Sequence, residues 1–400
     1  MVRLAYAWLI EIGKGIGKLF LNPLLYYLFF IAAILGVSRV KRERRNFHIR
    51  AENAYYELRQ LFPLGVVVGL SLSLVSIAAG LVIPVETLFF TAAFTVIWSL
   101  TTKIRWMAPA YTLGFAFFVT IFAADQRWQL SSFFTSLKVK EATIFPSIAV
   151  LLALLIIGEG ILIVRNGQKG SSPKLVKSKR GQMIGVHEVK RLWMLPLFLI
   201  IPSEALKSPF EWWPVFSIGG STFSIILIPF AVGFFQQIQG SLPSAAVKAV
   251  GRKVIALGVF VTLLSISGYW YPLASIAVVT LAIIGRELIS LRQRVADENL
   301  PFYFSKRNNG VMVLGIIPGS PASNMGLQVG ELVTKVNGRA VHDRSSFYEA
   351  LLKNRAHCKL EVLDVNDQIR FAQRALYEGD HHELGILFVK DETKKGNEAV

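Results

Sequence analysis

Long runs of apolar residues, separated by short polar segments, fill the chain from about residue 20 to residue 289. Most runs are about 17 to 23 residues long, the length that an α-helix needs to cross the hydrocarbon core of a bilayer. The weakest run contains Pro196 and Pro202, which disfavour a helix interior. The pattern predicts a membrane α-helical bundle over residues 61–289, with eight crossings at 61–83, 85–100, 107–124, 144–164, 192–205, 213–235, 254–270 and 271–289.

Residues 1–37 form a separate segment that is first amphipathic and then apolar. Trp8 and Ile12 fall on one side of a helix, and Lys14 and Lys18 fall on the other. This is typical of a helix at the membrane interface or of the first turns of a longer membrane helix. If the apolar run at 21–37 crosses the bilayer, the N-terminus lies on the opposite side from both ends of the bundle. If the run is re-entrant or interfacial, the N-terminus lies on the same side as those ends.

The basic residues are concentrated in the loops of the membrane part. The chain carries a net charge of +17, of which residues 1–302 contribute +16 and residues 303–400 contribute +1. A nucleic-acid-binding protein would carry this charge on a globular domain, so the distribution argues against nucleic acid as a partner. Seven Lys and Arg in residues 39–59 and eight in residues 165–191 predict two cytoplasmic loops. The second loop is also rich in Gly and Ser, which predicts a flexible linker.

The C-terminal part, residues 303–390, has the short strands and turn signals of a small α+β domain. Residues 311–317 are apolar and largely β-branched, as in a buried strand, and residues 332–336 form a second strand. The turn motifs around these strands are Pro318-Gly319-Ser320-Pro321-Ala322, Gly326, Gly330-Glu331 and Asn337-Gly338. In this order the motifs resemble the bacterial form of the PDZ domain. The resemblance implies a PDZ-like peptide-binding domain that follows the membrane bundle.

A PDZ-like domain binds a peptide as an added strand between a sheet edge and a helix, and an apolar-Gly-apolar loop binds the terminal carboxylate. The best match to that loop is Leu384-Gly385-Ile386-Leu387. The helix expected at 344–354 would form the other wall, with Phe347, Tyr348 and Leu351 either lining the pocket or belonging to the core. HtrA-like PDZ domains place the loop before their first strand. Its position here implies either a permuted domain or an ordinary strand beside a non-functional groove.

The sequence predicts no catalytic residue, metal ligand or cofactor site. An intramembrane metalloprotease needs two His one helical turn apart with a Glu between them, whereas His187-Glu188 has Arg191 at the fourth position. An HtrA-like protease needs a separate soluble domain for its Ser, His and Asp, and no remaining stretch is long enough. Glu159, within an apolar run, is either a transporter site or an acid paired near its helix end. The single cysteine, Cys358, excludes an intramolecular disulfide.

The order of an amphipathic N-terminus, an Arg-rich first loop, multiple spans and a terminal PDZ-like domain resembles the MinJ family of division-site topology factors from Gram-positive rods. The resemblance implies a multi-pass membrane protein, enriched at septa and poles, with its PDZ-like domain in the cytoplasm. Such a protein is an adaptor in contact with membrane lipid, and it bridges a DivIVA-like scaffold to a MinD-like ATPase. The alternatives are a membrane transporter and a regulatory subunit of a membrane protease.

Overall fold

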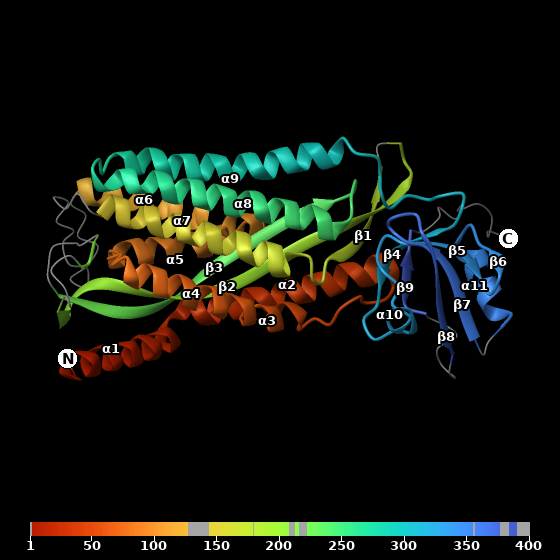
Figure 1. The fold of residues 1–400 in the computed structure, drawn as a ribbon, viewed down its shortest axis with the longest axis horizontal. Helices are drawn as coiled ribbons and strands as arrows, with labels where there is room; N and C mark the ends of the chain where they lie inside the picture. The colour runs from red at the N-terminus through yellow and green to blue at the C-terminus, as the bar shows by residue number, and fades with distance from the viewer. Residues whose placement is uncertain are drawn as a thin grey trace, which may run out of the picture.

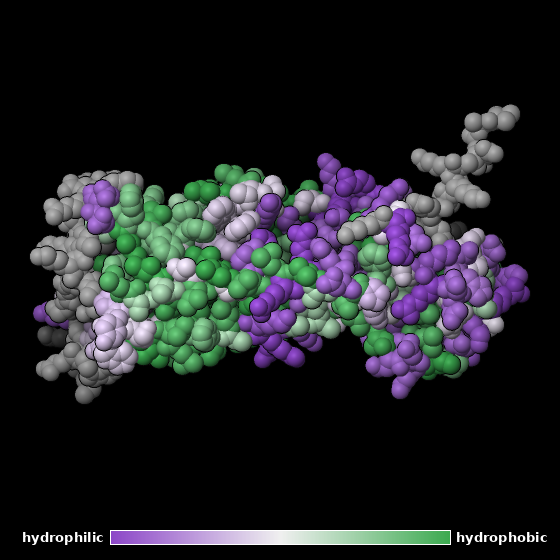
Figure 2. Space-filling model, turned by 90° about the horizontal axis from the view of Figure 1, so that it is seen from above, coloured by the Kyte–Doolittle hydropathy of each residue, from purple (hydrophilic) through white to green (hydrophobic). Residues whose placement is uncertain are grey.

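The computed structural model describes residues 2–126, 144–178, 180–207, 213–215, 222–354, 357–376 and 384–389. The molecule is elongated, and its two termini lie at opposite ends of the long axis (Figure 1). On the face seen in Figure 2, hydrophobic surface covers much of the part built from helices, and hydrophilic side chains gather toward the C-terminal domain. This division of the surface is the one expected for a membrane part that carries a water-exposed domain at one end.

The N-terminal segment consists of two successive helices, α1 (Val2–Leu21) and α2 (Pro23–Phe47). They separate at Asn22, whose side chain accepts a hydrogen bond from the N–H of Leu24, while Pro23 occupies the first helical position. Helix α2 is long and apolar enough to cross a membrane, and it runs from the inner end of α1 to the C-terminal domain (Figure 1). That the run at 21–37 crosses the bilayer stays a prediction.

In the described ranges, five helices are long and apolar enough to span a membrane, at Pro23–Phe47, Tyr56–Ala78, Ile144–Gly167, Pro243–Tyr269 and Ala274–Glu298, and two shorter apolar helices accompany them. The count of eight helical crossings is not confirmed. The helical elements that follow α2 are α3 (Tyr56–Gln60), α4 (Pro63–Ala78), α5 (Val85–Leu100), η1 (Ile104–Met107), α6 (Pro109–Asp125), α7 (Ile144–Leu162), η2 (Ile163–Gly167), α8 (Pro243–Ser265), η3 (Ile266–Tyr269) and α9 (Ala274–Glu298).

Two of the predicted helical spans are wrong, because the structure forms strands there. The run at 192–205 lies within β2 (Met183–Lys207), and most of the run at 213–235 lies within β3 (Thr222–Ile238). The two strands pair antiparallel along most of their length, and Pro196 faces Pro229 across the pair. Proline disrupts a helix interior but is tolerated in a strand where its missing N–H points away from the ladder. The membrane part is therefore a helical bundle that encloses a long β-hairpin.

The backbone of this hairpin forms hydrogen bonds between its strands and also with α4 and with Leu61, which precedes α4. The Ser73 side chain accepts a hydrogen bond from the N–H of Phe198 at 2.8 Å, and the N–H of Met194 donates to the carbonyl of Leu61 at 3.0 Å. Gly65 and Gly69 bring α4 so close to β2 that an added Cβ would overlap the carbonyl oxygens of the strand. Small residues at such a contact let two backbones approach, and internal pairing of polar groups is what a bilayer demands.

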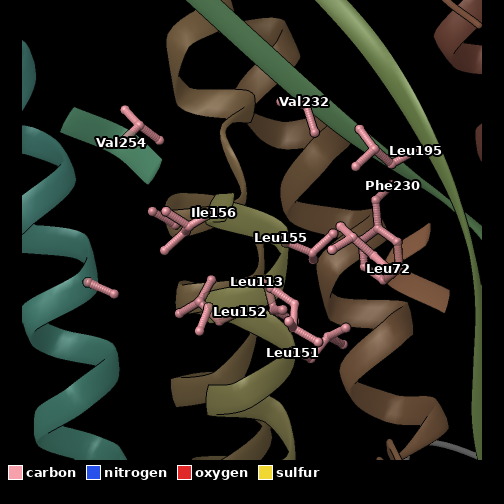
Figure 3. Packing of buried hydrophobic residues seen from close by; sticks show 14 of the residues in the cluster. Leu72, Leu113, Leu151, Leu152, Leu155, Ile156, Leu195, Phe230, Val232 and Val254 are labelled. Carbon is pink, nitrogen blue, oxygen red and sulfur yellow. The ribbon is translucent and has the colours of Figure 1, made fainter. Parts of the chain in front are cut away.

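The core of the membrane part forms where α7 packs between its neighbours. Leu151, Leu152, Leu155 and Ile156 of α7 are buried, and side chains from α4, α6, α8 and both strands of the hairpin surround them (Figure 3). Glu159, on the same helix, is fully buried and forms an ion pair with Arg286 of α9, with 2.7 Å between Oε1 and Nη2. The pairing corresponds to the interpretation of Glu159 as a paired acid, although its partner is Arg286 on another helix.

Residues 165–191 are not a flexible linker, which corrects the prediction. Strand β1 (Ser172–Lys177) pairs antiparallel with the start of β2. Arg191 is 1% exposed and donates to Glu57 at 3.0 Å, while Arg39 of α2 donates to the other oxygen of Glu57 at 2.6 Å. Both guanidinium groups also lie about 5 Å from the ring of Tyr56. Arg39 and Arg191 belong to the basic residues that were predicted to orient the helices in the membrane. In the structure they hold α2, α3 and β2 together.

The C-terminal domain is a six-stranded antiparallel sheet with two helices. Along the sheet the order is β8-β7-β5-β4-β9, and β6 pairs with β5 beside this path. Its elements are β4 (Val311–Ile316), α10 (Pro321–Asn324), β5 (Leu332–Val336), β6 (Arg339–Ala340), α11 (Arg344–Leu352), β7 (His357–Leu363), β8 (Ile369–Ala375) and β9 (Ile386–Phe388). The predicted strands at 311–317 and 332–336 are confirmed.

Candidate functional site

Strand β9 and helix α11 are the two elements that would form the walls of a peptide groove. Among the residues that the structure describes, β9 pairs with β4 alone, so it is an edge strand of the described sheet. Helix α11 begins at a capping box, in which Asp343 accepts from the N–H of Ser346 at 2.8 Å and the Ser346 hydroxyl accepts from the N–H of Asp343 at 3.1 Å. The Phe347 and Phe388 rings join helix and strand, with 5.0 Å between their centroids. Phe388, which the sequence analysis did not single out, thus helps to hold β9 against α11.

The loop before β9 has a defined backbone conformation. Gly385 has φ of +79°, a region that favours glycine, and a Cβ at this position would overlap Ser320. The carbonyls of Leu384 and Gly385 accept hydrogen bonds from the N–H groups of Ala322 and Ile317, at 2.9 and 2.8 Å. The N–H groups of Leu384 and Gly385 donate to no backbone carbonyl within the described parts of the chain. These donors are of the kind that binds a carboxylate.

The side chains of this loop are structural. Leu384, Ile386 and Phe388 are buried in the core of the domain, whereas Leu387 packs on the opposite face of the sheet, in a cluster that includes Phe47 of α2. Any contact that Leu384, Gly385, Ile386 and Leu387 make with a peptide would therefore come from their backbone.

The three residues selected on α11 have different surroundings. Phe347 and Leu351 are 0% and 2% exposed and belong to the core of the domain. Tyr348 is half-buried, and the Arg344 guanidinium lies 5.6 Å from the centroid of its ring. Of the three, Tyr348 is the side chain that can also reach a ligand from the helix, so we keep it as the candidate pocket residue.

The domain docks on the end of the membrane part through the sheet face opposite to its helices. The N–H of Gly185 in β2 donates to the carbonyl of Phe304 at 2.8 Å, and His187 contacts the carbonyl of Leu314, also at 2.8 Å. Apolar side chains from both parts close the interface, among them Phe47, Phe304, Met312, Leu314, Leu332 and Leu387. The long strand β2 thus links the bundle directly to the C-terminal domain, and the basic second half of α2 lies at this same end (Figure 1).

A protein from Bacillus subtilis (strain 168) named cell division topological determinant MinJ is 44% identical over 386 residues, which is 96% of this chain and 96% of that protein. This chain belongs to the MinJ family of cell division topological determinants. A relative from Lacticaseibacillus paracasei, named a probable cell division topological determinant MinJ, is 25% identical over 94% of this chain and 98% of its own. No solved structure matches.

In this MinJ-family chain, residues 312–364 match the PDZ domain family. The mitochondrial serine protease HTRA2 of Drosophila ananassae is 37% identical over 76 residues, but these cover only 19% of this chain and 17% of the protease. The match to the PDZ family ends before β8 and β9, so the loop at 384–387 lies outside it. The pairing of β9 with β4 is expected both for a permuted domain and for an ordinary strand beside a non-functional groove. The role of the loop in peptide binding stays a prediction.

The MinJ-family relatives that cover almost the whole chain are named as determinants of division topology and not as enzymes. Within the ranges that the structure describes, no group of three or more His, Cys, Asp or Glu side chains could hold a metal ion. His187 and Glu188 have structural surroundings: His187 lies in the interface, and Glu188 pairs with Arg42 and Lys174. Burial raises the pKa of the Cys358 thiol to about 12, which keeps it in the unreactive protonated form.

Proposed function

We propose that this MinJ-family protein is a membrane-anchored adaptor that bridges a DivIVA-like polar and septal scaffold to a MinD-like ATPase. The observation that carries the proposal is the 44% identity to the Bacillus subtilis protein over 96% of both chains, which includes the membrane bundle and the PDZ domain together. An adaptor raises the local concentration of its partner at a membrane site, and this requires a binding module joined to an anchor. The hydrogen bonds of Gly185 and His187 support the proposal, because they hold the PDZ domain in a fixed position on the membrane part.

In this proposal the PDZ domain faces the cytoplasm, and the protein is enriched at septa and poles. The second half of α2 carries Arg39, Lys41, Arg42, Arg44 and Arg45 at the same end of the molecule as the domain. Basic residues beside a membrane span favour the cytoplasmic side.

The sidedness can be tested with single cysteines in a Cys358→Ser background. Arg50→Cys, Lys169→Cys and Lys353→Cys place exposed thiols at the domain end, and Tyr271→Cys places one at the opposite end. In intact cells, a membrane-impermeant thiol reagent should label the cysteine at 271 and spare the other three. Labelling at two of those three would overturn the topology.

The bridging role can be tested by separating the two parts of the chain. Residues 1–300 should insert in the membrane without recruiting the MinD-like ATPase, whereas residues 301–400 should bind partners weakly and not restore division placement. Cells that carry either fragment alone should place septa wrongly and grow long. Restoration of normal placement by the soluble fragment would show that the tether is dispensable and would contradict the bridging mechanism.

Peptide binding in the groove is the proposed basis of partner capture. A peptide would add to the free edge of β9, with its carboxylate near the N–H groups of Leu384 and Gly385 and a side chain near Tyr348. Titration of the full-length protein with peptides ending in a free carboxylate, against the same peptides with an amidated end, tests this assignment. Equal affinity for both forms would remove the carboxylate loop from the proposal.

A further inference from the structure

A cavity of about 530 Å³ lies at the end of the membrane part nearest the C-terminal domain. It is bounded by η1, the end of β3 and the last turns of α9. Its volume falls in the range of small-molecule sites, which is about 300 to 1,000 Å³. The cavity is separate from the PDZ groove, and its walls are built from the membrane bundle alone.

Two lysines on the cavity wall have no ion-pair partner among the residues described. They are Lys103, at the start of η1, and Lys190, on β2. The two arginines that also line the cavity are each paired: Arg105 with Glu287 and Arg294 with Glu298, both at 2.8 Å. The Asp297 carboxylate accepts hydrogen bonds from the backbone N–H groups of Gln239 and Gly240. The wall therefore holds two lysines without an ion-pair partner against the single carboxylate of Asp297, and this positive excess favours an anionic ligand.

Gln236 of β3 is the second observation that indicates a ligand. It is 8% exposed and lines the cavity, and neither its side-chain oxygen nor its side-chain nitrogen has a hydrogen-bond partner in the described ranges. A buried amide without partners loses its hydrogen bonds to water without replacement, so native proteins keep few of them. A polar group bound in the cavity would satisfy this amide.

The surroundings of the cavity are those of a membrane interface. Next to Arg105 of the cavity wall, Trp106 stacks on Trp98 and meets Tyr111 edge-on, with ring centroids 5.5 and 4.8 Å apart, and the Arg105 guanidinium lies 4.9 Å from the centroid of Trp106. Aromatic residues with a cationic neighbour are typical of the headgroup region. Two apolar side chains of the wall, Phe235 and Leu291, are 39% and 46% exposed. They offer a surface for acyl chains next to a polar cavity.

We propose that this cavity binds the headgroup of an anionic phospholipid, with Lys103 and Lys190 facing the phosphate and the Gln236 amide hydrogen-bonded to the headgroup. The acyl chains lie along Phe235 and Leu291. The site is independent of the adaptor function, because it uses no residue of the PDZ domain. The lipid in this site would be bound specifically, in addition to the bilayer lipids that surround the bundle.

The test uses purified full-length protein in nanodiscs of phosphatidylcholine with a minor fraction of phosphatidylglycerol, and native mass spectrometry counts the lipids retained. Wild-type protein should retain phosphatidylglycerol over phosphatidylcholine. The double variant Lys103→Gln/Lys190→Gln should bind it roughly 30-fold more weakly, since each lysine near an anionic lipid contributes about fivefold. The matched control, Lys248→Gln/Lys253→Gln, removes two exposed lysines of α8 that do not line the cavity. It should retain phosphatidylglycerol as the wild type does.

Gln236→Leu separates lipid binding from folding. Since the amide has no partner in the lipid-free structure, its removal should leave the melting temperature without lipid unchanged or higher, while phosphatidylglycerol retention falls. A lower melting temperature without lipid would contradict the proposal, as would equal retention by the two lysine variants. Glycerol phosphate and inorganic phosphate serve as soluble competitors. If either displaces the lipid at low concentration, the cavity is a site for a soluble anion and the lipid proposal fails.

Discussion

His187 of β2 donates its Nε2–H to the backbone carbonyl of Leu314 in β4, at 2.8 Å, and thereby joins the membrane hairpin to the PDZ domain. A carbonyl only accepts, so this contact fixes the tautomer and leaves Nδ1 to accept from the Ser171 hydroxyl at 3.2 Å. The His187 ring also packs against Phe304, with 4.9 Å between centroids. The neutral imidazole is thus enclosed by the interface that holds the domain in place.

Docking of the PDZ domain should weaken in acid because of His187. Burial lowers the pKa of this imidazole from 6.5 to about 4. The docked state therefore binds fewer protons, so its stability is complete above pH 6.5 and falls as the pH drops from 6.5 toward 4. At 1.36 kcal/mol per pKa unit, the loss reaches roughly 3 kcal/mol. Hydrogen exchange of residues 299–310, measured at several pH values, reports the undocking.

The matched variant for this measurement is His187→Gln, which keeps a side-chain donor for Leu314 but has no titrating group. Its exchange rates, corrected for the intrinsic effect of pH, should change less between pH 6.5 and 4 than those of the wild type. If variant and wild type show the same pH profile, another group controls the docking.

Turn chemistry made much of the PDZ domain predictable from the sequence. Ser320 accepts a hydrogen bond from the N–H of Ser323 at the start of α10, with Pro321 as the first helical residue. Asn337 and Gly338 both have positive φ at the turn that joins β5 to β6. These preferences depend on the few residues around each turn, so a single sequence expresses them. The pairing of β9 with β4 is non-local, and no local pattern indicates it.

The membrane hairpin could not be predicted, because apolar runs of β2 and β3 have the length and hydropathy of helical spans. A continuous apolar run does not distinguish a buried strand from a buried helix. Pro196 and Pro202 were the available signal in the run at 192–205, and they weakened its helical interpretation without replacing it. The burial of Arg191 could not be predicted either, since its partner Glu57 lies on helix α3, far away in the sequence.

Gly385 should tolerate alanine less well than Gly319. Both residues have positive φ, but a Cβ at Gly385 would overlap Ser320, whereas a Cβ at Gly319 meets no atom within 4 Å. Gly319→Ala should cost only the backbone strain, about 1 to 2 kcal/mol, and Gly385→Ala should cost the strain and the overlap together. The two losses of stability can be compared by thermal unfolding of the full-length variants, with a signal that reports on the PDZ domain. Equal losses would mean that the loop shifts freely away from Ser320.

Phe347 and Tyr348 are neighbours on α11 with opposite predicted roles. Phe347→Ala should destabilise the domain by about 3 to 5 kcal/mol, since it empties a fully buried site against Phe388. Tyr348→Ala should leave the domain folded and weaken capture of the partner. Domain unfolding and co-purification of the DivIVA-like and MinD-like proteins measure the two effects. A folded Tyr348→Ala variant with unchanged capture would place the binding surface elsewhere.

The close contact between α4 and β2 should make Gly65 sensitive to any side chain. Gly65→Val would push a branched side chain into the backbone of Met194, which we expect to cost about 1 to 3 kcal/mol or more. Gly17→Val is the control on α1, because a Cβ there meets no atom within 4 Å. Melting of the detergent-solubilised protein should drop for the first variant and stay near the wild-type value for the second. Similar melting of both would argue against the hairpin packing on α4.

The Glu159–Arg286 pair should be structural, and a double substitution separates this role from transport. Breaking a buried ion pair from one side leaves an unpaired charge and costs about 3 to 5 kcal/mol, whereas replacing both partners by apolar residues is often neutral. Glu159→Leu or Arg286→Leu alone should therefore destabilise the bundle, and Glu159→Leu/Arg286→Leu should recover most of the loss. Both side chains are almost fully buried and lie within 2.7 Å of each other, so the recovery measures their interaction directly. The double variant should also restore division placement in cells. If it melts like the wild type but division placement stays defective, the charges have a function of their own, and transport through the bundle becomes the better account.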